Sequence, residues 1–202
     1  MRTLLLLLTM FTMSVNAEEK TVTKPIALVI HGGAGVIERD KLSAENEKAI
    51  RAALDRALDA GHAVLSKGGS ALDAVSAVVV ILEESPLFNA GKGAVFNADG
   101  KHELDASIME GHTQRAGAIA GVTTIRNPIR LARAVMEHSQ HVMLAGTGAE
   151  KFADTQPGID RVPNAWFDTD VRRKQLDLAQ QREPALYRRQ GLARHRHATS
   201  LP

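Results

Sequence analysis

Four carboxylates lie close together in the sequence, where two of them could act as a general acid and a general base: Glu83, Glu84, Glu103 and Asp105. Such a pair supports hydrolysis when one carboxyl group holds a proton and the other has lost its proton. Glu83 and Glu84, however, stand at the end of a predicted helix, where acidic side chains commonly face water. Solvated helix-end residues are therefore the favoured interpretation of this pair.

Other familiar catalytic and metal-binding signatures are incomplete. The sequence has no Gly-x-Ser-x-Gly motif to present a serine nucleophile, and it has no cysteine. His102-Glu103 lacks the second histidine of a zinc-binding helix, because Ala106 stands at that position. His138 and His141 have no third ligand nearby, and none of the Gly-x-Gly segments completes a dinucleotide fingerprint. The sequence therefore predicts no cofactor for catalysis.

Residues 82–93 carry a more specific pattern. The end of a helix runs into Pro86 and then into Asn89-Ala-Gly-Lys-Gly, whose backbone must turn tightly and expose carbonyl oxygens. Carbonyl oxygens in a fixed loop suit a hard monovalent cation, or an ordered turn around a substrate. An ordinary helix end followed by a connection is the alternative, and the residues alone favour it.

The expected helices have clear start signals. Ser43 caps a first helix, which a glycine pair at 68–69 ends. Ser70 and Asp73 form a capping box for the second helix. Asn127, followed by a proline, opens the third.

Short apolar runs predict strands between and around these helices. The expected strands are 26–30, 94–97, 103–109, 116–124 and 141–145, with a turn at 97–100. This order favours a layered α/β sandwich with a largely antiparallel sheet and helices outside. After about Leu178 we expect neither a strand nor a periodic helix.

The two ends of the chain differ from its body. Residues 1–17 combine Arg2, an apolar run and a small-residue cleavage site, which indicates a signal peptide and a periplasmic or secreted protein. From Glu18 to Gln181 there are 19 Lys and Arg against 22 Asp and Glu, whereas the tail from Arg182 onward has five Arg against one Glu. The mildly acidic body indicates no nucleic-acid partner, and the apolar run is too short to span a membrane.

Several segments occur in the order and at the spacing of one enzyme family. They are His31-Gly-Gly-Ala-Gly, Ser70-Ala-Leu-Asp-Ala, 82–93, 103–109, 117–121, 126–128 and 143–152. From about Lys24 to about Leu178 the chain resembles the α-subunit of plant-type asparaginases and isoaspartyl peptidases, which are N-terminal nucleophile hydrolases. The resemblance implies an αββα sandwich and a precursor that cuts itself before a threonine. That threonine then attacks the side-chain amide of asparagine or of a β-aspartyl dipeptide.

The resemblance also implies roles for individual residues. Asn89, His31 and Gly32 match substrate-binding positions, where Asn89 orients substrate or water and the glycine turn packs beside the nucleophile. The main-chain carbonyls expected to hold a structural sodium ion are those of Leu82, Glu83, Ser85, Phe88, Ala90 and Lys92. A β-subunit partner and a homodimer of αβ pairs are expected for the complete enzyme.

The sequence departs from the family in one decisive respect. It contains no Gly-Thr-Val-Gly, the start of the family's β-subunit, and Thr147 and Thr199 stand in other contexts. We therefore expect residues 18–178 to form a partial αββα sandwich that lacks the β-subunit half, has no catalytic nucleophile and does not turn over alone. Either a separate β chain completes it, or the chain is a non-catalytic truncated remnant. The basic tail, 179–202, reads as a frameshifted linker, with a genuine family linker as the alternative.

Overall fold

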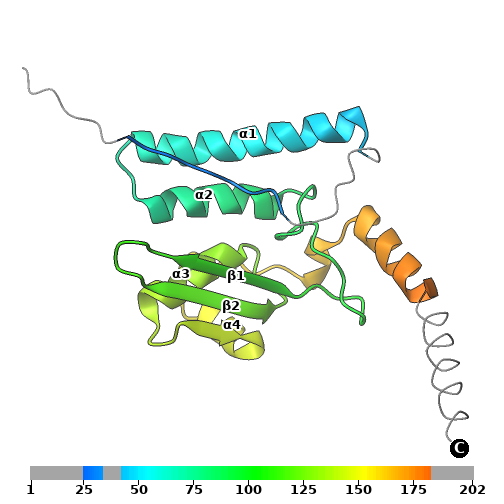
Figure 1. The fold of residues 1–202 in the computed structure, drawn as a ribbon. Coiled ribbons are helices and arrows are strands. Elements are labelled where there is room, and N and C mark those ends of the chain that lie inside the picture. The colour runs from blue at the N-terminus through cyan, green and yellow to red at the C-terminus, as the bar shows by residue number, and fades with distance from the viewer. Residues whose placement is uncertain (1–24, 34–41, 183–202) are drawn as a thin grey trace, which may run out of the picture.

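The protein is described by a computed structural model that covers residues 25–33 and 42–182. In chain order the elements are α1 (Ala44–Ser66), α2 (Ala71–Glu84), β1 (Leu104–Met109), β2 (Ala116–Val122), α3 (Pro128–His138), β3 (Met143–Ala145), α4 (Gly146–Ala153) and the 3-10 helix η2 (Asn164–Phe167) (Figure 1). The predicted signal peptide and residues 183–202 of the tail lie outside the described residues. None of the described helices is both long and apolar enough to cross a membrane.

The first two helices begin where the sequence predicted. The side chain of Ser43 accepts a hydrogen bond from the Asn46 N–H at 3.2 Å, so Ser43 is the N-cap of α1. Ser70 and Asp73 exchange backbone and side-chain hydrogen bonds in a capping box at the start of α2. α1 ends before Gly68, whose φ of 79° favours glycine. The two helices pack side by side and form one layer of the molecule (Figure 1).

The sheet has three strands in the order β1-β2-β3. β1 and β2 are antiparallel, with Ala106 opposite Ile119, whereas β2 and β3 are parallel. Helices α3 and α4 pack against the sheet, while Asp105, Ser107 and Met109 of β1 are exposed. The predicted α/β class is confirmed, but the sheet is mixed.

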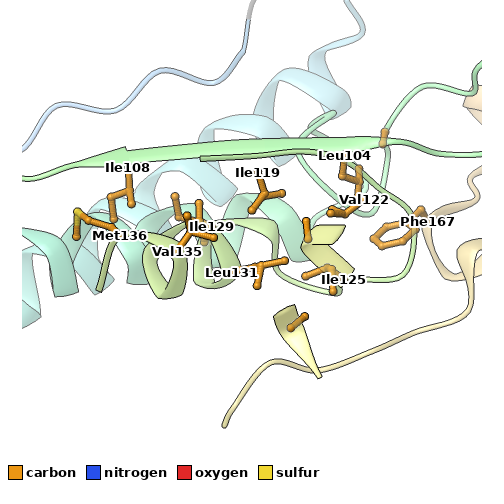
Figure 2. Packing of buried hydrophobic residues seen from close by; sticks show 14 of the residues in the cluster. Leu104, Ile108, Ile119, Val122, Ile125, Ile129, Leu131, Val135, Met136 and Phe167 are labelled. Carbon is orange, nitrogen blue, oxygen red and sulfur yellow. The ribbon is translucent and has the colours of Figure 1, made fainter. Parts of the chain in front are cut away.

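The main core lies between the sheet and α3. Ile108 and Ile119 point from the strands toward the helix, where Leu131 and Val135 are fully buried (Figure 2). Phe167 of η2 closes one end of this cluster and is also fully buried. The alternation of inward and outward residues along β1 follows the two-residue period of a half-buried strand.

The predicted strand at 26–30 is wrong. Residues 25–33 have no regular secondary structure, and Val29 is 91% exposed. Leu28 and Ile30 pack instead against a second apolar cluster, formed by α1, α2 and Phe88. No strand in the described part of the chain pairs with this segment, and an unpaired backbone does not form a ladder.

The predicted strand at 94–97 is also wrong, although the turn that follows it is confirmed. Asn97 N–H donates to Lys101 O at 2.7 Å, and Gly100 N–H donates to Asn97 O at 3.1 Å, so these backbone groups close a turn and join no sheet.

Two α-helices of the described residues, in addition to the 3-10 helix η2, are absent from the prediction. The first is α4, which begins directly after β3. The second spans residues 170–182 and continues past Leu178, where we expected irregular chain. Thr169 starts it, because its hydroxyl accepts the Arg172 N–H at 3.3 Å and its carbonyl accepts the Arg173 N–H at 2.9 Å.

Candidate functional site

Residues 85–93, here called the carbonyl loop, fold back onto the C-terminal end of α2. Ser85 is the C-cap of that helix, and its carbonyl accepts the Phe88 N–H at 3.4 Å. Lys92 N–H donates to Glu83 O at 2.6 Å, which closes the loop on the last turn of the helix. Both ends of the carbonyl loop therefore lie beside the last turn of α2.

Two glycines allow this tight path. A Cβ atom on Gly91 would collide with the Glu83 carbonyl, and one on Gly93 would collide with the Phe88 carbonyl and lie 2.7 Å from Pro86 O. Gly93 also has a φ of 147°, which side chains rarely adopt. Backbone oxygens thus gather closely around the two glycine α-carbons.

The six residues predicted to hold sodium all belong to α2's last turn and this loop. Leu82, Glu83 and Phe88 are buried, and the other three, Ser85, Ala90 and Lys92, are half-buried. Neutral carbonyl oxygens held in a tight loop suit a hard cation, although those of Leu82, Glu83 and Ser85 already accept the N–H groups of Ser85, Lys92 and Phe88. Across the described residues, no three His, Asp or Glu side chains gather as ligands for a metal ion. The residues fit the predicted ion, whose binding stays a prediction.

The segment around His31 lies against the carbonyl loop. An added methyl group on Gly32 would lie 3.4 Å from the Phe88 ring, and one on Gly33 would lie 3.3 Å from Asn89 Oδ1. The His31 ring accepts the Gly33 N–H through Nδ1 at 3.2 Å, so its other nitrogen carries the proton when the ring is neutral. The structure thus brings together the three residues predicted to bind substrate, from positions almost 60 apart in the chain. His31 and Asn89 are both exposed.

The side chain of Glu83 is buried and binds the start of α3. Its interpretation as a solvated helix-end residue is therefore wrong. The residue is 1% exposed, and its Oε1 accepts the Ile129 N–H at 2.8 Å in the first turn of α3. Burial raises the pKa of this carboxyl from 4.5 to about 8, although the Ile129 N–H and the Asn127 amide oppose the shift. Asn127 itself occupies the N-cap position without capping α3. Glu83 therefore caps α3 from a different helix.

Glu84, the neighbouring residue, has a different environment. Its two carboxylate oxygens accept Arg126 Nε at 2.8 Å and Nη2 at 3.0 Å, and Oε1 also accepts the Asn127 amide at 3.1 Å. These bonds to Arg126 lower the pKa of Glu84. Asp105, another of the four candidate carboxylates, accepts the Gly121 N–H at 2.8 Å across the exposed side of the β1–β2 pair. These three carboxylates therefore bind structural partners, with the Asn127 amide beside both Glu83 and Glu84, and do not form an acid–base pair.

The sequence pattern missed an aromatic support beside the loop. The Lys92 ammonium lies 5.1 Å from the centre of the Trp166 ring, and the Arg126 guanidinium lies 5.3 Å from it. Arg172 Nε donates to Gly93 O at 2.6 Å, which ties the helix 170–182 to the end of the loop. The chain has a single tryptophan, and this residue was the available signal in the sequence for such a support, because large aromatic side chains usually pack against other residues.

A family model described as Asparaginase matches residues 23–198 of this chain. The chain belongs to this family. Its glycine turn and carbonyl loop lie within the matched residues, and the resemblance predicted from the sequence is confirmed.

Relatives in the asparaginase family include the isoaspartyl peptidase of Escherichia coli, 50% identical over 158 residues, which are 78% of this chain and 49% of that protein. The isoaspartyl peptidase/L-asparaginase of Xenopus laevis is 46% identical over 151 residues, 75% of this chain and 47% of its own. The human isoaspartyl peptidase/L-asparaginase is 43% identical over 153 residues, 76% and 48% of the two chains. The chain thus spans about half the length of the relatives it matches, all of which carry the names of hydrolases.

Proposed function

We propose that this chain is the α portion of an amidohydrolase that acts on L-asparagine, on β-aspartyl dipeptides, or on both. Family membership and the names of the relatives support this reaction class. The single observation that carries the proposal is the contact between the glycine turn at 31–33 and the carbonyl loop at Phe88 and Asn89. The contact joins two segments that are far apart in sequence into one surface, here called the ledge, on which His31 and Asn89 are exposed.

Asn89 is the residue of this ledge that we assign to the substrate. Its amide is exposed and can both donate and accept a hydrogen bond, as needed to hold a substrate amide or a water molecule. His31 and Gly32 shape the adjoining wall, because the His31 bond to Gly33 N–H holds the turn in place. These residues bind and orient the substrate, and none of them supplies a nucleophile.

The nucleophile belongs to a part of the enzyme that these 202 residues do not contain. The sequence lacks Gly-Thr-Val-Gly, so an N-terminal threonine must come from elsewhere. We assign the missing β-subunit half of the αββα sandwich to that same part, together with the groups that stabilise the oxyanion of the intermediate. The chain alone should show no self-cleavage and no turnover. The complete enzyme is expected to be a dimer of αβ pairs.

A sodium ion in the carbonyl loop belongs to the same proposal. The main-chain oxygens of Leu82, Glu83, Ser85, Phe88, Ala90 and Lys92 would hold it. The ion would keep the loop, and hence Asn89, in a fixed place without taking part in the reaction. Export to the periplasm or beyond, directed by residues 1–17, is proposed from the sequence alone.

The test is to produce the chain together with the C-terminal half of the E. coli relative and to purify the complex. We expect ammonia release from L-asparagine, or amino-acid release from a β-aspartyl dipeptide, from the complex and not from the chain alone. Asn89→Ala should lower kcat/KM of the complex by about tenfold or more. Asn46→Ala, on the exposed surface of α1, is the matched control. A stable complex that releases no product, or full activity in Asn89→Ala, would overturn the proposal.

A further inference from the structure

Glu83 touches two parts of the molecule at once. Its carbonyl oxygen accepts a hydrogen bond from Lys92 of the carbonyl loop, while its side chain reaches the first turn of α3. We propose that the Glu83 side chain is a positioning residue for cation binding, which it couples to the start of α3. The inference rests on the proposed sodium ion in the loop.

The backbone of Glu83, in the last turn of α2, closes the carbonyl loop. Its carbonyl accepts the Lys92 N–H at 2.6 Å and lies so close to Gly91 that only glycine fits there. Leu82 and Glu83 also stand in the last turn of α2, where their carbonyls accept the N–H groups of Ser85 and Lys92. Any shift of Glu83 would therefore move at least one of the proposed cation ligands.

The side chain of Glu83 holds this backbone in place. Oε1 accepts the Ile129 N–H at 2.8 Å, a donor that Asn127, the N-cap residue, leaves free. Oε2 is buried and has no hydrogen-bond partner among the described residues, while the nearby Asn127 amide favours the charged form of the carboxyl group. The bond to α3 is the contact that orients the side chain.

This arrangement makes cation affinity depend on a contact outside the ligand set. Six neutral carbonyls bind a cation tightly only when they are already in place, because ordering them during binding costs affinity. Outer partners of metal ligands commonly change affinity by about 10- to 100-fold when they are removed. Conversely, a bound cation should hold Glu83 still and protect the start of α3.

The experiment measures melting temperature as sodium chloride replaces choline chloride at constant ionic strength. We compare the unchanged chain with Glu83→Met, which keeps the side chain's length and loses the acceptor, and with Glu83→Gln, which keeps an acceptor. Glu150→Gln is the matched control, because Glu150 also accepts backbone N–H groups, from Thr123 and Thr124, away from the loop.

We expect sodium to raise the melting temperature of the unchanged chain, of Glu83→Gln and of Glu150→Gln with similar half-saturating concentrations. Glu83→Met should need about tenfold more sodium. A purely structural role would lower its melting temperature and leave the sodium dependence unchanged, which would overturn the inference while the ion proposal stands. If sodium stabilises no variant, the ion proposal and the inference both fail, whereas the assignment of Asn89 is tested separately by activity.

A measurement on the unchanged chain covers the case in which Glu83→Met does not fold. Amide hydrogen exchange at Ile129 should slow when sodium replaces choline, because the donor's partner becomes better ordered. The amides of α4 should show no such change. Equal exchange at Ile129 with and without sodium would overturn the inference.

Discussion

Replacing Glu83 with glutamine should remove a specific pH dependence of stability. Burial raises the pKa of this carboxyl to about 8 in the folded chain, against 4.5 for the ordinary group. Between these values the folded chain keeps a proton that the unfolded chain has lost. Stability must therefore fall as pH rises through this window.

The size of the effect follows from the shift. Each pH unit in the window costs about 1.4 kcal/mol, so stability should fall by about 4 kcal/mol between about pH 5 and about pH 8. Glu83→Gln is neutral throughout and keeps an acceptor for the Ile129 N–H, so it should lack this loss. The difference in free energy of unfolding between the two proteins isolates Glu83 from every other titrating group.

The assay is urea unfolding, followed by circular dichroism, at several pH values and a fixed sodium concentration. Glu150→Gln is the matched control, because hydrogen bonds from Thr123 and Thr124 lower the pKa of Glu150 against the effect of burial and keep its stabilising charge present above about pH 5. The difference between the unchanged chain and Glu150→Gln should be flat across the window. A flat difference for Glu83→Gln as well would refute the assignment of a buried, proton-holding carboxyl.

Three further substitutions test the packing that positions the site. Gly93→Ala places a methyl group against backbone oxygens at a φ of 147° and should cost about 2 kcal/mol or more in urea unfolding, whereas Gly148→Ala, with open space around it, should change stability by less than about 1 kcal/mol. Leu131→Ala empties a fully buried position and should cost about 3 kcal/mol in the same assay, against about 0.5 kcal/mol or less for Val142→Ala, which is 64% exposed. Ser70→Ala removes the capping box of α2 and should lower the free energy of unfolding by about 1 kcal/mol, with faster amide exchange in the first turn of that helix. Equal losses within either matched pair, or unchanged exchange in the third case, would contradict these assignments.

Local signals predicted three of the described α-helices, α1, α2 and α3, and all three strands of the described sheet. Ser43 and the Ser70–Asp73 box marked the starts of α1 and α2, because capping needs only residues three apart. Asn127 and the proline after it marked the start of α3 correctly, but the capping bond came from Glu83. Nothing local in the sequence distinguishes a carboxylate that caps a distant helix from one that faces water.

Strand predictions failed where no partner strand was available. Residues 26–30 are apolar and rich in branched side chains, yet they pack on helices without joining the sheet. A strand is stable only when its backbone pairs with another, and pairing depends on the whole fold. Within this run, Leu28 and Ile30 are half-buried against the helices, whereas Ile26, Ala27 and Val29 are exposed.

The sequence by itself determined the family, the starts of α1, α2 and α3, and the glycines that let the carbonyl loop close. Only the tertiary structure decided that the turn at His31 meets Asn89, that Glu83 reaches Ile129, and that Trp166 supports the loop. The first group depends on neighbours a few residues away, where backbone sterics and short hydrogen bonds operate. The second depends on burial and on contacts between distant segments, which arise when the core between the sheet and α3 packs and the two helical layers come together.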